Sequence, residues 1–513
     1  VLDATNGWSR PATAEELAGL PATALANARQ AAEQAGRKGY LITLDCPSYH
    51  AVLTYCDNAA PRKEVYNAYC TRASEQGPDA GRWDNAGLLI ETLDLRRELA
   101  SLLGFESYAA LSLETKMAES PEQVVDFLRQ LAWQSLPQAR ADRQALADFA
   151  RDECGVASLA AWDVGYYSEK LRHSRYQVSQ EDVRPWLPVD RVLNGLFEVV
   201  RRLCGVEVRE AGEFDSYHPE ARLFELVQDG ELLARFYLDL YARSGKRGGA
   251  WMGNCRVRRH TEGGVQVPVA YLVCNFTPPA GGTPALLSHS ELTTLFHEFG
   301  HGLHHMLTRQ SVAAVSGING VAWDAVELPS QFLENWCWER EALAVISSHH
   351  ETGEPLPAEL LDRLLAARNF QSAMAMVRQL EFALFDMRLH TEWTGGDSAE
   401  VKALLDEVRR EVAVIIPPAF NRFQNSFTHV FAGGYAAGYY SYKWAEVLSA
   451  DAFSRFEEEG IFNRETGAAF RTHILETGGA RQAMDSFVAF RGREPVIEPL
   501  LRHSGITATA QTM

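Results

Sequence analysis

The spacing of apolar residues changes twice along this chain, and this change restricts its fold more than any other feature. Apolar residues recur at helical spacing through about the first 200 residues and again from Ser288 almost to the end. Between about 205 and 276 the pattern is that of short strands. The sequence therefore predicts a mainly α-helical protein with a small sheet inserted between two helical parts.

Individual elements follow from this pattern. The predicted helices cover 61–75, 85–103 and 121–152, with one more that starts at a capping box in Thr13–Glu16 and runs toward Gly36. The predicted strands are 206–209, 223–227, 232–240 and 269–276. Asp229-Gly230 is a strong signal for a hairpin turn between two of these strands. We therefore expect the sheet to be antiparallel.

Charge, hydropathy and cysteine usage exclude several classes of protein. The 513 residues include 49 basic and 67 acidic side chains, and the net charge of −18 argues against nucleic acid as a partner. No apolar run reaches the ~18 residues of a membrane span, and the first residues do not form a secretory signal. Eight cysteines without a CxxC pair favour a reducing compartment, so we expect a cytoplasmic protein.

The strongest local motif is His297-Glu298-Phe299-Gly300-His301. Histidines at positions i and i+4 lie on one face of a helix, so both imidazoles can bind one zinc ion. Glu298 could then take a proton from the activated water that attacks a carbonyl group. The alternative is a helix with structural histidines, but this helix is apolar enough to be buried, where unpartnered histidines are costly. Gly300 and Gly302 each weaken a helix by ~1 kcal/mol relative to alanine, which indicates close packing of another element.

A catalytic zinc site needs a third protein ligand and an open position. The longer pattern HExxHxxGxxH does not continue here, because position 304 is His and position 307 is Leu. The candidates on the next predicted helix, Trp323–Arg340, are Asp324, Glu327, Glu334 and Glu339. Spacing alone does not choose among them, and one that is not a ligand can orient a ligand histidine. Glu291 is another candidate for that orienting role, or a helix N-terminal carboxylate favoured by the helix dipole.

Three segments together resemble the M3 zinc peptidases: His297–Leu307 (HEFGHGLHHML), Trp323–Trp338 (WDAVELPSQFLENWCW) and His429–Trp444 (HVFAGGYAAGYYSYKW). The resemblance covers the whole chain. It implies a helical fold of two lobes separated by a deep central channel, with one zinc ion per chain beside the small sheet. The zinc ligands implied by the resemblance are His297, His301 and Glu327.

The resemblance also implies a Gly/Tyr segment that closes over bound peptide. The implied catalytic residues are Glu298 as general base, with Tyr442, Tyr435 and His429, and the implied substrate-binding residues are Gly433, Gly434 and Tyr439. Adjacent glycines suit a closing loop, because they give the backbone flexibility or allow close approach. From the pattern alone, a core aromatic cluster at helical spacing is the alternative, and we interpret Tyr440 as core.

The predicted organisation has three parts. Residues 1–170 form the first part of a helical lobe, 171–370 the zinc-bearing lobe with the sheet, and 371–513 the second part of the helical lobe. The strand at 269–276 is expected to offer its edge to an extended peptide. Family members carry a further N-terminal helical region before the point that matches Val1, and we hypothesise that it is a separate, associated fragment. Otherwise the resemblance implies a monomer.

The predicted function is hydrolysis of internal bonds in short, unstructured peptides by a zinc-dependent oligopeptidase. One alternative is a peptidyl-dipeptidase, which releases C-terminal dipeptides and needs a donor for the substrate carboxylate. Another alternative is a non-catalytic peptide-binding protein. The intact Glu298 argues against it, because a binding protein has no use for a general base.

Overall fold

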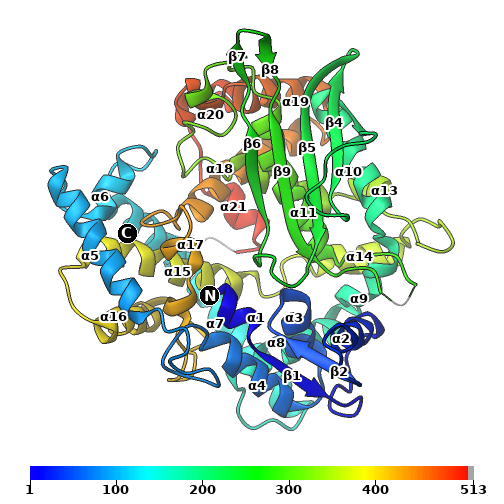
Figure 1. Ribbon diagram of the computed structural model, residues 1–513, viewed down its shortest axis with the longest axis vertical. Helices are drawn as coiled ribbons and strands as arrows, with labels where there is room; N and C mark the ends of the chain where they lie inside the picture. Colours follow the sequence, from blue (N-terminus) through cyan, green and yellow to red (C-terminus); the bar gives the residue numbers. More distant parts are fainter. Residues whose placement is uncertain (281, 507–513) are drawn as a thin grey trace.

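The computed structural model describes residues 1–280 and 282–506, and it confirms the predicted order of helices, strands and helices (Figure 1). The protein is mainly α-helical, with a small sheet between residues 207 and 276. Within the described ranges, every helix is too short or too polar to span a bilayer.

The helices before the main sheet agree with the predicted pattern, except near the N-terminus. They are α1 (Leu2–Asn6), α2 (Ala22–Gln34), α3 (Cys46–Tyr55), α4 (Ala59–Cys70), α5 (Ala86–Leu102), α6 (Tyr108–Leu113), α7 (Pro121–Asp152), α8 (Val164–Tyr176), α9 (Gln180–Val183) and α10 (Val189–Cys204). Two short strands, β1 (Ser9–Ala12) and β2 (Tyr40–Thr43), pair antiparallel beside α2.

The predicted N-terminal capping box forms, but the helix expected to start from it does not. The N–H of Thr13 donates to Glu16 Oε2 at 2.9 Å, and the N–H of Glu16 donates to Thr13 Oγ1 at 3.2 Å. The chain then turns, and α2 begins only at Ala22. Gly19 adopts a φ of +90°, and Pro21 disfavours helical backbone before it, so the helix cannot continue through this point.

The main sheet has the strand order β3-β4-β5-β9-β6. Its strands are β3 (Glu207–Glu210), β4 (Arg222–Gln228), β5 (Glu231–Tyr241), β6 (Trp251–Arg256) and β9 (Val269–Phe276), and a separate hairpin is formed by β7 (Arg259–Thr261) and β8 (Gly264–Gln266). The predicted turn at Asp229-Gly230 joins β4 to β5, and both turn residues have positive φ, 50° and 83°.

Two predictions about this sheet are wrong. The sheet is mixed rather than antiparallel, because β5 and β9 pair in parallel. The strand at 269–276 is not an edge strand, because β9 lies between β5 and β6. After β5 the chain reverses direction and forms β6, which is not hydrogen-bonded to β5. It then passes through β7 and β8 and forms β9, which lies between β5 and β6. The edge next to β9 therefore belongs to β6.

The helices after the sheet are α11 (His289–Met306), α12 (Leu328–Glu334), α13 (Arg340–Ile346), α14 (Ala358–Ala366), α15 (Ser372–Glu392), α16 (Ser398–Val412), α17 (Thr428–Phe431), α18 (Ser441–Glu459), α19 (Arg464–Phe470), α20 (Ala483–Arg491) and α21 (Glu498–His503). The single helix predicted over Trp323–Arg340 is interrupted. A turn precedes α12, and a 3₁₀ turn over Asn335–Trp338 separates it from α13.

Two large hydrophobic clusters position the site. The first contains the sheet, α10 to α13 and parts of α18 to α20, and the second contains helices from α5 to α7 and from α15 to α18. The helix α11 packs on β5, β6 and β9, where side chains such as Phe236 and Leu272 are fully buried. The segment after residue 370 contributes to both clusters, and the three-part division at 170 and 370 stays a prediction.

Gly300 allows α11 to meet the start of α12. A Cβ built at Gly300 would lie 2.4 Å from the carbonyl oxygen of Pro329 and 2.5 Å from Cα of Ser330. At Gly302 the nearest atom is a side-chain methyl of Leu272 at 3.1 Å. Both glycines therefore lie where another element packs closely, as the sequence indicated.

We expect Gly300→Ala to lower the free energy of unfolding by about 1–3 kcal/mol, because the methyl group would push against rigid backbone. Urea denaturation followed by circular dichroism measures this change. Gly302→Ala is the matched control. Its methyl group would meet a flexible side chain, and alanine favours the helix, so we expect a smaller loss. Equal losses for the two variants would contradict the packing argument.

Candidate active site

The N-terminus of α11 is fixed by a capping box. The N–H of Glu291 donates to Ser288 Oγ at 3.1 Å, and the N–H of Ser288 donates to Glu291 Oε2 at 2.7 Å. The Glu291 carboxylate also accepts hydrogen bonds from Arg184 and from the N–H of Thr277. Glu291 thus caps the helix and anchors neighbouring segments, and it does not orient a histidine of the motif.

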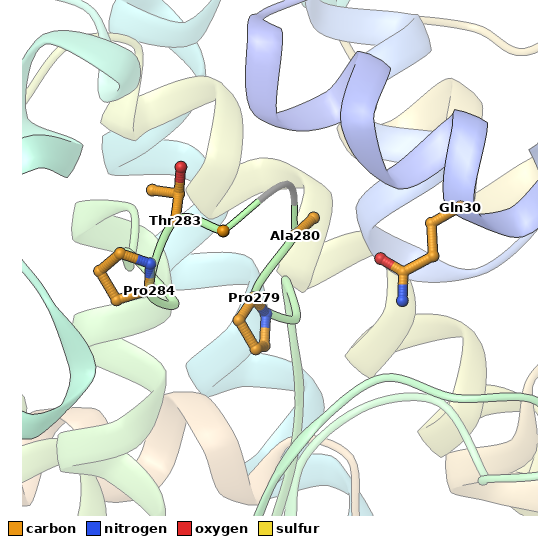
Figure 2. Close-up of a pocket in the computed structure, with 6 residues that line it drawn as sticks. Gln30, Pro279, Ala280, Thr283 and Pro284 are labelled. Atoms are coloured by element: carbon orange, nitrogen blue, oxygen red, sulfur yellow. The ribbon is translucent and has the colours of Figure 1, made fainter.

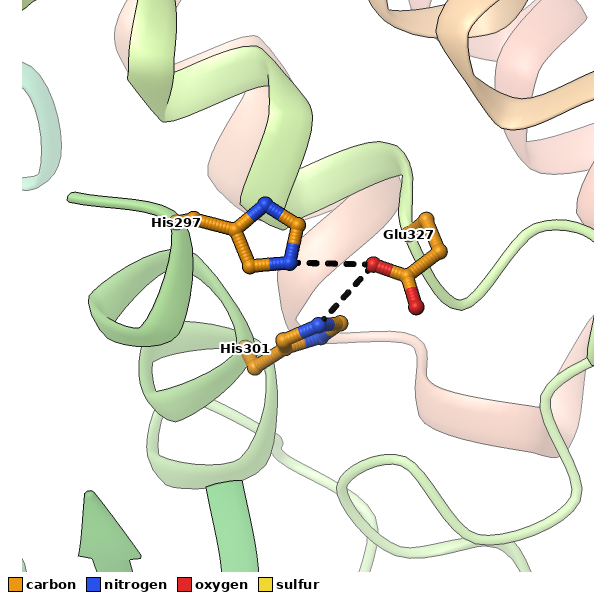
Figure 3. Close-up of side chains that lie close together, drawn as sticks. All are labelled: His297, His301 and Glu327. Atoms are coloured by element: carbon orange, nitrogen blue, oxygen red, sulfur yellow. Dashed lines mark ion pairs between the residues drawn. The ribbon is translucent and has the colours of Figure 1, made fainter. Parts of the chain in front are cut away.

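The two histidines of the motif converge on Glu327, the residue just before α12 (Figure 3). Glu327 Oε2 lies 3.2 Å from His297 Nε2 and 3.0 Å from His301 Nε2. One ligand atom from each residue lies within 4.8 Å of the others. Two imidazoles and a carboxylate in this arrangement could hold a metal ion, with a further position open.

The charges of the cluster are strongly coupled. Burial alone would lower the pKa of His297, but Glu327 and Glu334 raise it well above its usual range. Burial would raise the pKa of Glu327, but His301 and His297 hold it well below its usual range. Glu327 is only 1% exposed, so its negative charge requires a cationic partner such as protonated imidazoles or a metal ion.

Glu298 lies beside this cluster and has an unused oxygen. Its side chain is buried, and Oε2 has no hydrogen-bond partner among the described residues. Burial raises the pKa of Glu298, while His297 and His301 oppose the rise. A buried carboxylate oxygen normally has a donor, and a water molecule on a metal ion would supply one. The residues therefore fit a metal site.

The other acidic candidates have distinct surroundings. Glu334 Oε1 accepts a hydrogen bond from His297 Nδ1 at 2.6 Å, so it orients the imidazole. Asp324 is fully buried and accepts bonds from the N–H groups of Met117 and Ala118 and from the hydroxyl of Tyr440. Asp324 therefore joins three segments of the fold. Tyr440 is a core residue, as interpreted from the sequence.

We expect Glu334→Gln to weaken metal binding by about 10–100-fold, because the amide can still accept a bond from His297 but lacks the negative charge. Competition with a coloured chelator measures the affinity. Glu339→Gln provides a matched control, since Glu339 lies beyond the 3₁₀ turn near Arg368. The orienting role would be wrong if both variants bound the metal as tightly as the unmodified protein.

The predicted catalytic tyrosines lie together at this cluster. The rings of Tyr435 and Tyr442 stack with centroids 4.8 Å apart, and the Tyr435 hydroxyl donates to Glu327 Oε1. Burial and then Glu327 raise the pKa of both phenols well above the usual range, so both stay protonated. The His429 ring lies 6.0 Å from Tyr435 and 6.2 Å from Tyr442, and burial lowers its pKa.

The predicted substrate-binding residues have different surroundings. A Cβ at Gly434 would lie 2.7 Å from Trp323 Cζ2, and a Cβ at Gly433 would lie 2.9 Å from the carbonyl oxygen of His429. These glycines therefore permit close packing here. Tyr439 is buried, and its hydroxyl donates to Gln379 at 3.0 Å.

Sequence reasoning missed Asp386, which anchors the Gly/Tyr segment. Its carboxylate accepts hydrogen bonds from three successive N–H groups, those of Ala437, Gly438 and Tyr439, at 3.0, 2.8 and 2.9 Å. Ala437 adopts a φ of +45°, an unfavourable conformation for alanine that these bonds hold in place. The available signal was a carboxylate in the otherwise apolar stretch 383–387 of the sequence.

A separate surface hollow is lined by residues outside this cluster. Gln30 of α2 faces the loop before α11 across it, and the other lining residues are Pro279, Ala280, Gly282, Thr283 and Pro284 (Figure 2). None of these side chains is an acid, a base or a metal ligand. The hollow therefore does not compete with the His297 cluster as a candidate active site.

Comparison with known proteins identifies a matching family and several peptidases that are similar in sequence. Residues 52–506 match peptidase family M3. Oligopeptidase A of Escherichia coli (strain K12) is 58% identical over 509 residues, which cover 99% of this chain and 75% of the relative. Dipeptidyl carboxypeptidase of the same strain is 35% identical, covering 96% of this chain and 72% of the relative.

Two solved structures share the fold. One is described as PZ peptidase A with inhibitor 2, with a TM-score of 0.62 and 15% identity over 94% of this chain and 73% of that one. The other is an M32 carboxypeptidase from Deinococcus radiodurans R1, with a TM-score of 0.52 and 14% identity over 94% of this chain and 79% of that one. At this level of identity the likeness concerns the fold alone.

Proposed function

We propose, since the chain belongs to peptidase family M3, that it is a zinc-dependent oligopeptidase hydrolysing internal bonds of short, unstructured peptides. The observation that carries this proposal is the cluster of His297, His301 and Glu327 beside the unpartnered carboxylate oxygen of Glu298. A protein that only binds peptides has no use for a buried base at that position. The cytoplasmic location and the monomeric state stay predictions.

Each residue of the site has a chemical role in this proposal. Zinc held by the two histidines and Glu327 supplies a Lewis acid for the scissile carbonyl and for a water molecule. Glu298 accepts the proton of the attacking water and passes it to the leaving amine, and its burial, which raises its pKa, suits a base. Tyr435 and Tyr442 donate hydrogen bonds to the developing oxyanion, with His429 as a neutral neighbour.

The arrangement of the two large hydrophobic clusters supports a preference for short peptides over folded proteins. The candidate metal-binding residues belong to elements of the first hydrophobic cluster, whereas Tyr435 and Tyr442 belong to a segment that packs on the second cluster. We place the substrate between them, in a channel that excludes folded proteins by size. The edge of β6 is available for an extended peptide to add as a strand.

We expect Tyr435→Phe to lower kcat by about 10²-fold with a small change in KM, because one donor to the oxyanion is lost. Steady-state hydrolysis of a fluorogenic peptide measures both constants. Tyr439→Phe is the matched control, since it removes a hydroxyl that bonds to Gln379 in the interior. Similar losses of kcat in both variants would count against an oxyanion role for Tyr435.

A peptide blocked at both ends tests the proposed function. We expect internal cleavage, detected by mass spectrometry, which a zinc chelator stops and added zinc restores. Cleavage only when the C-terminus is free would instead indicate a peptidyl-dipeptidase. Zinc-dependent binding without cleavage of either peptide would indicate the binding protein considered above.

A further inference from the structure

β6 is an outer strand of the main sheet, and its two ends have different surroundings. Toward its C-terminal end, the Asn254 side chain donates to Asn319 Oδ1 at 3.3 Å, so the loop after α11 lies against the strand there. The opposite end begins at Trp251, directly after the turn formed by residues 245–250. A peptide strand added to this edge therefore has one of its ends next to that turn.

The turn holds Arg247 in a defined position. Lys246 is nearly buried and donates from Nζ to Asp239 Oδ1 at 2.9 Å. The amide of Asn275 donates to the carbonyl oxygens of Arg247 and Gly249 at 2.8 and 2.7 Å. Gly249 has a φ of +91°, which a residue with a side chain rarely adopts. Side-chain hydrogen bonds therefore hold the backbone of this turn at Arg247 and at its neighbours.

The guanidinium of Arg247 is exposed and has no carboxylate partner among the residues that the structure describes. It lies over the Trp251 ring, 5.7 Å from the centroid. The missing ion pair stands out in a chain with a net charge of −18, because acidic side chains outnumber basic ones. Burial lowers the pKa of His429, and the positive charge of Arg247 lowers it further. Arg247 is thus close enough to His429 for its charge to act on that imidazole.

We propose that Arg247 binds a carboxylate of the peptide substrate and so sets which peptides are held along β6. The proposal rests on the proposed peptidase function, because it requires a peptide in this site. A guanidinium that lacks an ion pair can form paired hydrogen bonds with a carboxylate, and the Trp251 ring beside it favours some of its orientations over others. The carboxylate can be the C-terminus of the peptide or an acidic side chain near that end.

Binding to the zinc-loaded Glu298→Gln protein tests this inference without requiring turnover. Three fluorescent peptides share one sequence: the first has a free C-terminus, the second a C-terminal amide, and the third an amide with a glutamate near the end. We expect Arg247→Gln to raise the Kd of one or both carboxylate-bearing peptides by about five- to tenfold. The Kd of the neutral amide should change less than twofold, and Arg247→Lys should retain part of the preference.

Arg259→Gln is the matched control, because it removes the same charge from an exposed position on β7. A loss confined to the free C-terminus identifies that group as the ligand, and a loss confined to the glutamate peptide identifies the side chain. Equal changes for all three peptides, or changes matched by Arg259→Gln, would overturn the proposal. Absence of cleavage by the unmodified enzyme would instead contradict the proposed function, since the binding measurements are independent of it.

Discussion

Glu298→Gln is expected to lower kcat by about 10²–10⁴-fold, the usual contribution of a general base. Glutamine has nearly the same shape as glutamate but cannot accept the proton of the attacking water. The measurement is single-turnover hydrolysis of a blocked fluorogenic peptide at saturating zinc. KM should change little, since Glu298 is not expected to bind the peptide.

The variant must keep its metal and its fold for this result to be informative. Glu298 is not among the three residues that converge on one point, so one equivalent of zinc should remain bound. The substitution also replaces a buried carboxylate whose Oε2 has no hydrogen-bond partner among the described residues, so the free energy of unfolding should not fall. A variant that retains zinc and more than half of the original kcat would remove Glu298 from the mechanism.

Features set by residues close in sequence could be predicted. The positions of His297 and His301 follow from helical geometry, because residues four apart share a helix face. The hairpin at Asp229-Gly230 follows from backbone preferences of those two residues. The capping box at Thr13–Glu16 also forms, but whether a helix continues beyond a box depends on the next turn, where Gly19 and Pro21 stop it.

Features set by distant contacts could not be predicted from spacing. Glu327 lies in a turn before α12, so the helical spacing assumed for Trp323–Arg340 did not apply, and the resemblance alone selected it. The parallel pairing of β5 with β9 depends on how the nearly thirty residues between these strands fold, which no local sequence pattern indicates. Asp386 was missed because its partners are backbone N–H groups about fifty residues later.

Glu327→Gln is expected to remove most of the metal and, with it, the activity. A neutral amide would replace the Glu327 carboxylate, whose Oε2 lies 3.2 Å from His297 Nε2 and 3.0 Å from His301 Nε2. Loss of a direct ligand should weaken zinc binding by more than the about 10–100-fold that loss of an outer partner causes. Metal analysis after dialysis against a chelator measures the zinc content, and peptide hydrolysis is measured on the same samples.

Asp324→Asn separates metal binding from general damage to the fold. Asp324 is another buried carboxylate, three residues earlier, that bonds to two backbone N–H groups and to Tyr440. Its loss should lower the free energy of unfolding by about 1–3 kcal/mol, because buried donors lose their partner, yet it should leave the zinc content unchanged. If Asp324→Asn released zinc as readily as Glu327→Gln, the loss of zinc in both variants would reflect unfolding. The result would then contradict the assignment of Glu327 as the third zinc ligand. If zinc were lost only from Glu327→Gln, the Glu327 carboxylate would be assigned as a metal ligand. Both substitutions remove a buried carboxylate, but only Glu327 contacts the two histidines.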